Sequence, residues 1–173
     1  MKALKIIVAM IFIIIGASYL ISPNVEVERS IEINAPIEKV FAQANDLKNW
    51  ENWSPWFEKD PNMKIIYSSP TMGKDAFYSW ESDNENVGLG KLRILESVEN
   101  SSIKTELLFD GEDDPAFGGW KFEKTNNGTK VSWGFKADMG MNPVARYVAL
   151  FLDGMVGPDF EKGLANMKKH CEQ

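Results

Sequence analysis

The chain has 173 residues, 44% of them hydrophobic, with 25 acidic residues against 19 basic ones and a net charge of −6. This length is typical of a single domain with or without a tail, and the acidic balance argues against a nucleic-acid partner, because binding phosphates needs a basic surface. The single cysteine, Cys171, and the single histidine, His170, exclude a disulfide framework and a metal centre rich in these residues, so we expect no metal and no cofactor. Six Trp, ten Phe, four Tyr and eight Met residues favour binding over catalysis.

An apolar segment opens the chain. Residues 6–21 contain no charged side chain, and as a helix they would be about 24 Å long at about 1.5 Å per residue. Ala3 and Leu4 extend this segment towards the ~30 Å thickness of a bilayer core. The sequence therefore predicts a single-pass transmembrane anchor over residues 3–21, within a tail of residues 1–22.

The charges around this segment predict its orientation. Lys2 and Lys5 precede the apolar run, and Glu26 and Glu28 follow it, which by the positive-inside rule places the N-terminus in the cytoplasm and the domain outside. A cleaved signal peptide is the alternative, although the small residues of its candidate cleavage site, 16–18, are followed by further apolar residues. A buried soluble helix is disfavoured because the run has no polar face.

The domain begins with a strand and two short helices. Residues 25–34 alternate between apolar and polar side chains, which is typical of a half-buried strand. Pro36 suits the first position of a helix, and apolar residues recur at helical spacing over residues 37–44. A second short helix over residues 47–57 must end near Pro55.

Strands then dominate until the last part of the chain. Turn sequences separate six further strand-length runs, and such short connections favour an antiparallel sheet; the runs are residues 63–68, 75–81, 89–98, 103–109, 120–124 and 129–137. Two helices, over residues 143–152 and 158–171, are predicted at the end. This order predicts one α+β domain, residues 23–173, whose sheet is covered by the last helix.

Short motifs occur along the domain from about residue 25 to the end. They are Arg29-Ser30-Ile31, Asn34-Ala35-Pro36, Val40-Phe41, Asp46, Trp50, Trp53, Pro55-Trp56, Trp80, Gly88-x-Gly90, Gly128-Thr129-x-Val131-x-Trp133 and Phe160-x-x-Gly163-Leu164. In order and spacing they resemble the START-like, or SRPBCC, superfamily, in particular its bacterial polyketide cyclase/dehydrase-like branch. No single motif is specific to the family.

The resemblance implies a helix-grip fold, in which a curved antiparallel sheet of about seven strands wraps around a long C-terminal helix, with an apolar cavity between them. Members of the family bind lipids, sterols, polyketides or plant hormones, and some are cyclases. The resemblance therefore implies a small, lipid-like hydrophobic or amphipathic ligand in the cavity under the C-terminal helix, and a bacterial inner membrane for the anchor. The ligand-binding candidates are Trp53, Trp80, Trp120, Trp133, Phe135, Phe160, Leu164 and Met167.

These aromatic and aliphatic side chains have a competing interpretation. Aromatic residues bury more area than any others in a small domain, so each candidate also suits an ordinary core position. Flexible thioethers such as that of Met167 suit a pocket that accepts varied apolar shapes. Core packing and a cavity wall overlap in this fold, because the cavity is an underfilled part of the core.

Two alternative functions stay open at this stage. A cyclase or dehydrase needs an acid or base beside the substrate, and Arg93, Glu96, Glu106 and Tyr78 lie on predicted strands, but charged side chains there favour the surface. The other alternative is an envelope protein that binds a partner instead of a ligand, which a contiguous exposed apolar patch would favour.

One acidic loop has a residue pattern that could bind a cation. Residues 110–114 include four carboxylates, which suit calcium, but their spacing does not match an EF-hand loop, so we interpret them as a solvated turn. Residues 1–22 hold two lysines and no acid, so the domain without them has 17 basic and 25 acidic residues, a net charge of −8. A basic patch that grips anionic lipid is therefore not expected.

Overall fold

The computed structural model describes residues 2–111 and 114–173. The helices in chain order are α1 (Lys2–Ser18), α2 (Ile37–Asn45), the 3-10 helix η1 (Leu47–Asn52), α3 (Pro55–Lys59) and α4 (Pro143–Cys171). The strands are β1 (Asn24–Ile33), β2 (Lys64–Tyr67), β3 (Phe77–Glu81), β4 (Leu89–Val98), β5 (Ser102–Phe109), β6 (Ala116–Lys124) and β7 (Thr129–Asp138).

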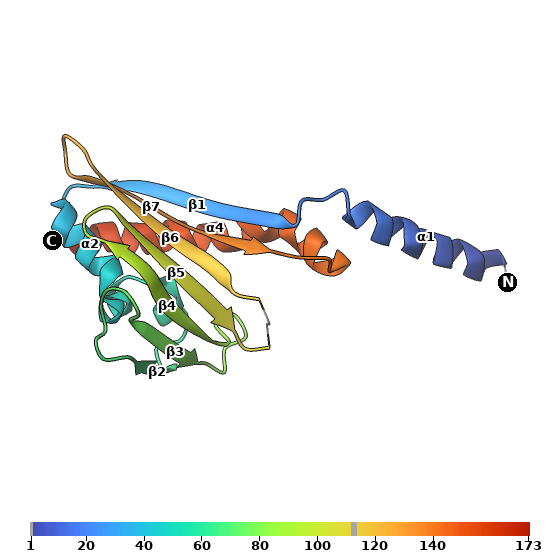
Figure 1. Ribbon diagram of the computed structural model, residues 1–173, viewed down its shortest axis with the longest axis horizontal. Helices are drawn as coiled ribbons and strands as arrows, with labels where there is room; N and C mark the ends of the chain where they lie inside the picture. The colour runs from blue at the N-terminus through green and yellow to red at the C-terminus, as the bar shows by residue number, and fades with distance from the viewer. Residues whose placement is uncertain (1, 112–113) are drawn as a thin grey trace.

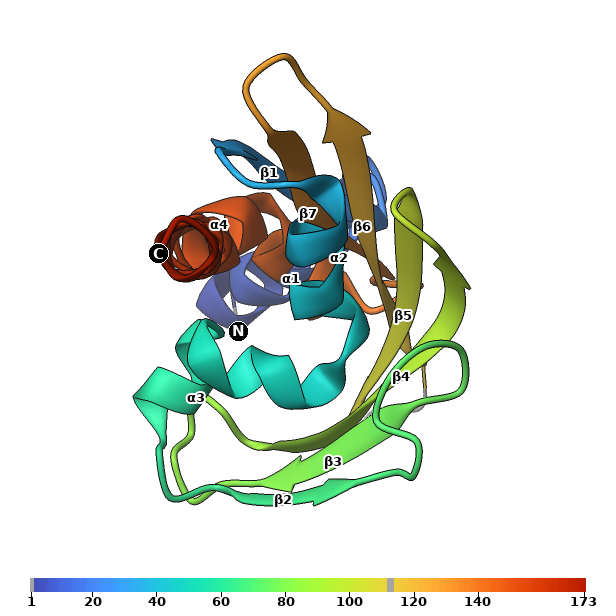
Figure 2. The ribbon, with the colours of Figure 1, turned by 90° about the vertical axis from the view of Figure 1, so that its left-hand side faces the viewer.

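In these described residues, the seven strands form one antiparallel sheet in the order β1-β7-β6-β5-β4-β3-β2. The sheet is curved, and α4 lies along its concave side beside β1 and β7, with α2, η1 and α3 on the same side (Figures 1 and 2). Alternating side chains produce this arrangement. Val131 and Trp133 of β7 are buried beneath the helices, whereas Lys130, the residue before Val131, is exposed on the other face of the sheet. The predicted α+β, helix-grip architecture is confirmed.

Helix α4 corrects the sequence prediction, because it runs unbroken through the predicted interruption before Pro158. Pro158 has no N–H to donate to the carbonyl of Gly154, four residues earlier. Gly154 is exposed, so water can reach that carbonyl. Tertiary contacts then join the two halves, since Arg29 of β1 bonds to Asp153 before the proline and to Glu161 after it.

Two other elements differ from their predicted bounds by more than two residues or are divided. Strand β6 begins at Ala116 instead of at residue 120, because pairing with both β5 and β7 compensates for the weak strand preference of Gly118 and Gly119. The helix predicted over residues 47–57 is divided into η1 and α3, with the break at Trp53 and Ser54.

Helix α1 has 17 residues and projects away from the domain, which it touches near the start of α4 (Figure 1). Among residues 2–111 and 114–173, no helix combines the length and the apolar composition needed to cross a membrane. The spanning helix predicted over residues 3–21 is thus not found. α1 ends at Ser18, where turn hydrogen bonds from Tyr19 and Leu20 to carbonyls three residues earlier replace helical ones, and Pro23 disfavours helix just beyond.

Candidate ligand-binding face

An aromatic cluster fills one half of the concave side of the sheet. The indole rings of Trp120 and Trp133 stack with centroids 4.5 Å apart, and Trp53 meets them edge-on at 5.5 and 5.4 Å. Trp50 joins them, and all of these indoles are buried. Three of the predicted ligand-binding residues, Trp53, Trp120 and Trp133, therefore pack against one another.

Helix α4 closes this cluster from above. Phe160, Leu164 and Met167 are buried along its core-facing side, and the Phe160 ring lies 4.4 Å from that of Trp133. The approach depends on Gly163, since a Cβ there would lie 2.7 Å from Trp133 Cζ3. The predicted stripe of the last helix is thus brought together with the tryptophans, in a packed core.

The other half of the concave side is open. Trp80, Leu107 and Phe135 are half-buried there, and Phe109 is 43% exposed. They share the concave face with the cluster, because each lies two residues along its strand from a buried residue of that face: Trp80 from Tyr78, Leu107 and then Phe109 from Thr105, and Phe135 from Trp133. From β3 to β7 this open half is about 19 Å wide, at about 4.8 Å between neighbouring strands.

Small residues leave room in this open half. Trp80 packs against Gly90, where a Cβ would be 2.6 Å from its Cζ2 atom, and meets Phe109 at a centroid distance of 5.8 Å. Ala116 and Ala137 occupy the same face on β6 and β7. The open half is an apolar surface that the helices leave partly uncovered. It consists of Trp80, Gly90, Leu107, Phe109, Ala116 and Phe135.

Unpaired polar atoms lie within the packed half. The indole N–H groups of Trp50 and Trp53 donate to the carbonyls of Ala44 and Gln43 at 3.0 and 3.1 Å. In the described residues Trp120 Nε1, Gln43 Oε1 and Ser54 Oγ are buried with no partner. An unpaired buried donor is costly, so Trp120 Nε1 is a candidate donor to an oxygen atom inside the domain.

Two tyrosines line the concave face beside Trp80. Burial raises the pKa of Tyr78 well above its usual value. Burial and then a 2.7 Å hydrogen bond to Glu51 Oε1 raise the pKa of Tyr67. Both hydroxyls therefore stay protonated at neutral pH and can donate a hydrogen bond, but neither can act as a base.

The charged acid–base candidates of the sequence lie elsewhere. Arg93, Glu96 and Glu106 alternate with inward residues and face the convex side, where Glu96 pairs with Lys104 at 2.9 Å. Tyr78 is the one member of that predicted group on the concave face. The structure does not assemble these four side chains into a site.

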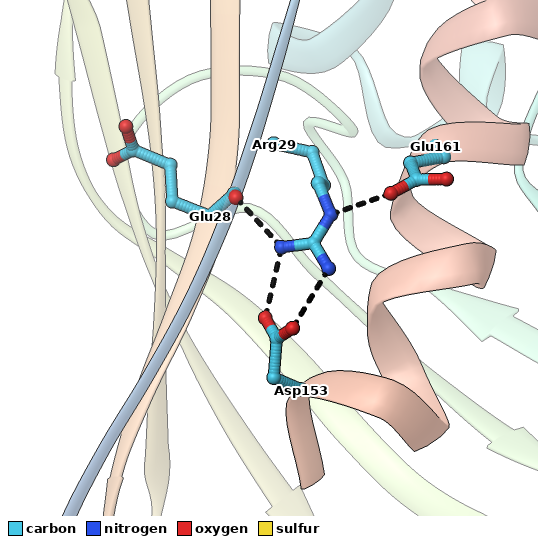
Figure 3. A network of polar contacts seen from close by, with 4 residues as sticks. All are labelled: Glu28, Arg29, Asp153 and Glu161. Carbon is cyan, nitrogen blue, oxygen red and sulfur yellow. Dashed lines mark hydrogen bonds and ion pairs between the residues drawn. The ribbon is translucent and has the colours of Figure 1, made fainter.

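Arg29 forms a network of ion pairs that the sequence prediction missed. It projects from the concave face of β1, and its Nη1 and Nη2 atoms donate to Asp153 at 2.8 and 3.0 Å while Nε donates to Glu161 at 2.7 Å (Figure 3). The carboxylates raise the pKa of Arg29, and the guanidinium lowers the pKa of Asp153. A charged residue in register with Val25, Val27 and Ile31 was the available signal.

Phe109 and Leu107 were also missed. They continue the alternation of Ile103 and Thr105 along β5, and this alternation was a sufficient signal for their face. The alternation could not predict how exposed the two side chains are, because their exposure depends on how far the helices extend over the sheet.

Two surface hollows of the described chain are polar. One, of about 440 Å³, is lined by residues such as Lys59, Asp60 and Asn84; the other, of about 910 Å³, lies around Glu32, Asn127 and Lys168. Neither is lined by the aromatic residues. Within residues 2–111 and 114–173 no cluster of His, Cys, Asp or Glu suits a metal ion, and residues 112 and 113 of the acidic loop lie outside the described residues.

Comparison with known proteins gives one family. The family described as "Polyketide cyclase / dehydrase and lipid transport" matches residues 24–172. A search of curated proteins found no match.

Solved structures share the fold at low sequence identity. A protein of unknown function from Staphylococcus aureus is 14% identical with a TM-score of 0.64, over 87% of this chain and 97% of that one. A protein from Chromobacterium violaceum is 12% identical with a TM-score of 0.62, over 86% and 99%. The di-domain ARO/CYC StfQ of the steffimycin biosynthetic pathway is 12% identical with a TM-score of 0.62, over 86% of this chain and 51% of that one.

Proposed function

We propose that this chain, which belongs to the polyketide cyclase/dehydrase and lipid transport family, binds a small hydrophobic or amphipathic ligand on the open half of its concave face. One observation carries the proposal: Trp80, Leu107, Phe109 and Phe135 stay partly exposed on the side that α4 covers only in part. The expected binding residues at this face are Trp80 and Phe135. Trp53, Trp120, Trp133, Phe160, Leu164 and Met167 support it from the packed half.

Burial of apolar surface supplies the driving force. A buried phenylalanine covers about 200 Å², so a ligand that covers the exposed part of Phe109 removes roughly 85 Å² from water. At about 25 cal/mol per Å² this contributes about 2 kcal/mol. The remaining half-exposed side chains add to this, and the polar end of an amphipathic ligand stays at the open rim.

A cyclase or dehydrase reaction is the second candidate, which the ARO/CYC proteins of the same fold suggest. Such a reaction needs a group that accepts a proton. Tyr67 and Tyr78 are held protonated, and Arg93, Glu96 and Glu106 face the convex side. Binding therefore has more support than catalysis.

Membrane attachment through α1 is the second part of the proposal. Its side chains from Ile6 to Ile15 are exposed and apolar on every side, and such a surface is stable in lipid and not in water. With the apolar residues 19–21 after α1 completing the crossing, Lys2 and Lys5 favour an N-terminus on the cytoplasmic side and a domain on the extracytoplasmic side of a bacterial inner membrane. Protease digestion of the domain in intact spheroplasts, with inverted vesicles as the control, tests this orientation.

Native mass spectrometry tests the ligand. The domain comprising residues 23–173 should carry a hydrophobic molecule when purified without detergent. Phe109→Glu, on the concave face, should lose it, whereas Phe117→Glu should keep it, because Phe117 is 48% exposed on the convex face of the neighbouring strand. A wild-type domain that carries nothing, and takes up nothing from added lipid, would refute the proposal.

A further inference from the structure

We propose that the N-terminal half of α4 is a second membrane contact, which lies on the lipid surface that α1 enters and holds the domain against it. The contact is an outward stripe made of Val144, Val148, Phe151 and Met155. The inference rests on the proposed attachment of α1 to a membrane. It goes beyond that attachment by assigning the lipid surface to a second element.

The stripe is exposed although the residues are large and apolar. Val144 is 71% exposed, Phe151 66%, Met155 62% and Val148 44%. Their spacing of 4, 3 and 4 residues places them on one side of the helix. An exposed contiguous apolar patch of this kind marks an interaction surface.

The stripe points away from the domain core. At about 100° per residue, its centre lies about 160° around the helix from the buried stripe of Phe160, Leu164 and Met167. Each half of α4 is therefore amphipathic, with opposite apolar sides. The second half packs its apolar side on the sheet, whereas the apolar side of the first half faces away from the domain and is free to contact another surface.

Contact with α1 identifies this occupant as lipid. Tyr147 Oη donates to the carbonyl of Ile14 at 2.8 Å, and the Arg146 guanidinium lies over the Tyr19 ring at 5.2 Å. The apolar surface of α1 thus continues directly into the stripe. A membrane that takes up α1 reaches the first turns of α4 without any rearrangement of these contacts.

The charges around the stripe agree with this occupant. In an acidic domain, residues 139–152 contain no acid and a single base, Arg146. The guanidinium of Arg146 is turned inward, where Nε donates to the carbonyl of Gly140 at 2.8 Å and Nη1 to that of Ile21 at 3.1 Å. Asp153, the one acid within the span of the stripe, lies about 170° around the helix from the centre of the stripe at about 100° per residue and accepts from Arg29. The stripe itself therefore offers lipid an uncharged surface.

Single-cysteine labelling of the full chain tests the proposal. In a Cys171→Ala background, one cysteine at a time replaces Val148, Phe151, Met155, Phe12 of α1, or Lys169 as an outward control in the second half of α4. Each variant carries an environment-sensitive fluorophore and is reconstituted in phosphatidylcholine vesicles with nitroxide-labelled lipid. Near-UV circular dichroism confirms that each variant is folded.

The expected result is a blue shift and loss of emission at positions 148 and 151, a weaker effect at 155, which is farther from α1, and none at 169. Quenching at 12 but not at 148 or 151 would overturn this inference and leave the attachment of α1 in place. No quenching at 12 would instead refute the attachment. Shielding of positions 148 and 151 without vesicles, together with a dimer in sedimentation, would also overturn the inference, because a second copy would occupy the stripe.

Discussion

At the scale of single residues, the position of Trp80 depends on the absence of a side chain at Gly90. The indole packs against this glycine within the open half, with Phe109 beside it. The space that a Cβ would need is already occupied by the Trp80 ring and by the carbonyl of Leu108. Gly90 therefore determines the shape of the proposed ligand face.

Replacement of Gly90 by alanine should destabilise the domain. A Cβ there would lie 2.6 Å from Trp80 Cζ2 and 2.7 Å from the Leu108 carbonyl oxygen, and overpacking of this kind costs about 1–3 kcal/mol. Urea unfolding measures the change. Gly119→Ala is the control, because its Cβ would meet nothing closer than 3.9 Å; equal stability of the two variants would contradict the close contact of Trp80 with Gly90.

The tyrosines predict a loss of stability in alkali. The pKa values of Tyr67 and Tyr78 are raised in the folded domain, so above pH of about 10, the ordinary tyrosine value, the unfolded chain loses protons that the folded chain keeps. Their contribution to stability is complete below that pH and decreases above it. Urea unfolding against pH should show this decline, with a shallower slope for Tyr67→Phe, and identical slopes would contradict the raised pKa.

At the scale of elements, Arg29 connects β1 to both halves of α4. Asp153 and Glu161 flank Gly157, and a Cβ at Gly157 would lie 2.1 Å from Arg29 Nη2, so the guanidinium crosses the helix where the helix has no side chain. This contact and the exposed carbonyl of Gly154 let one helix continue past Pro158. Helix α4, which covers the packed half of the concave face, is thus tied to β1 by one cation.

Loss of this cation should loosen α4. Arg29→Met keeps the length of the side chain and removes its hydrogen bonds, so a lower Tm and faster amide exchange over residues 153–161 are expected. Asp153→Asn should have a larger effect than Glu161→Gln, because Asp153 accepts two of the bonds. Unchanged exchange in Arg29→Met would show that the helix needs no such contact.

Two glycines of α4 should respond in opposite ways to alanine. At Gly163 a Cβ would meet Trp133 at 2.7 Å and Pro55 at 3.1 Å, neither of which can move freely, so we expect a loss of about 1–3 kcal/mol. At Gly154 a Cβ would meet nothing within 4 Å, and the better helix former should stabilise by up to about 1 kcal/mol. Thermal unfolding distinguishes them, and a stabilising Gly163→Ala would contradict the close contact of α4 with the cluster.

At the scale of the whole molecule, local patterns predicted the architecture and left out what depends on long-range packing. Alternation and turn residues were sufficient to predict the strands, and the helical spacing of apolar residues was sufficient to predict which side of α4 faces the core. Continuity of α4 could not be predicted, because it depends on Arg29, more than a hundred residues earlier. Likewise, which aromatics are buried depends on how far the helices cover the sheet: Trp120 is enclosed, and Trp80 on the same face is half-exposed.

Titration of tryptophan fluorescence with a brominated long-chain fatty acid tests the central claim most directly, since bromine quenches indoles that it contacts and Trp80 lies at the proposed face. For the domain of residues 23–173, we predict saturable, one-to-one quenching that an unbrominated fatty acid reverses. Phe109→Glu should abolish it and Phe117→Glu should retain it. Quenching that does not saturate, or that the two variants share equally, would contradict a ligand site on the concave face.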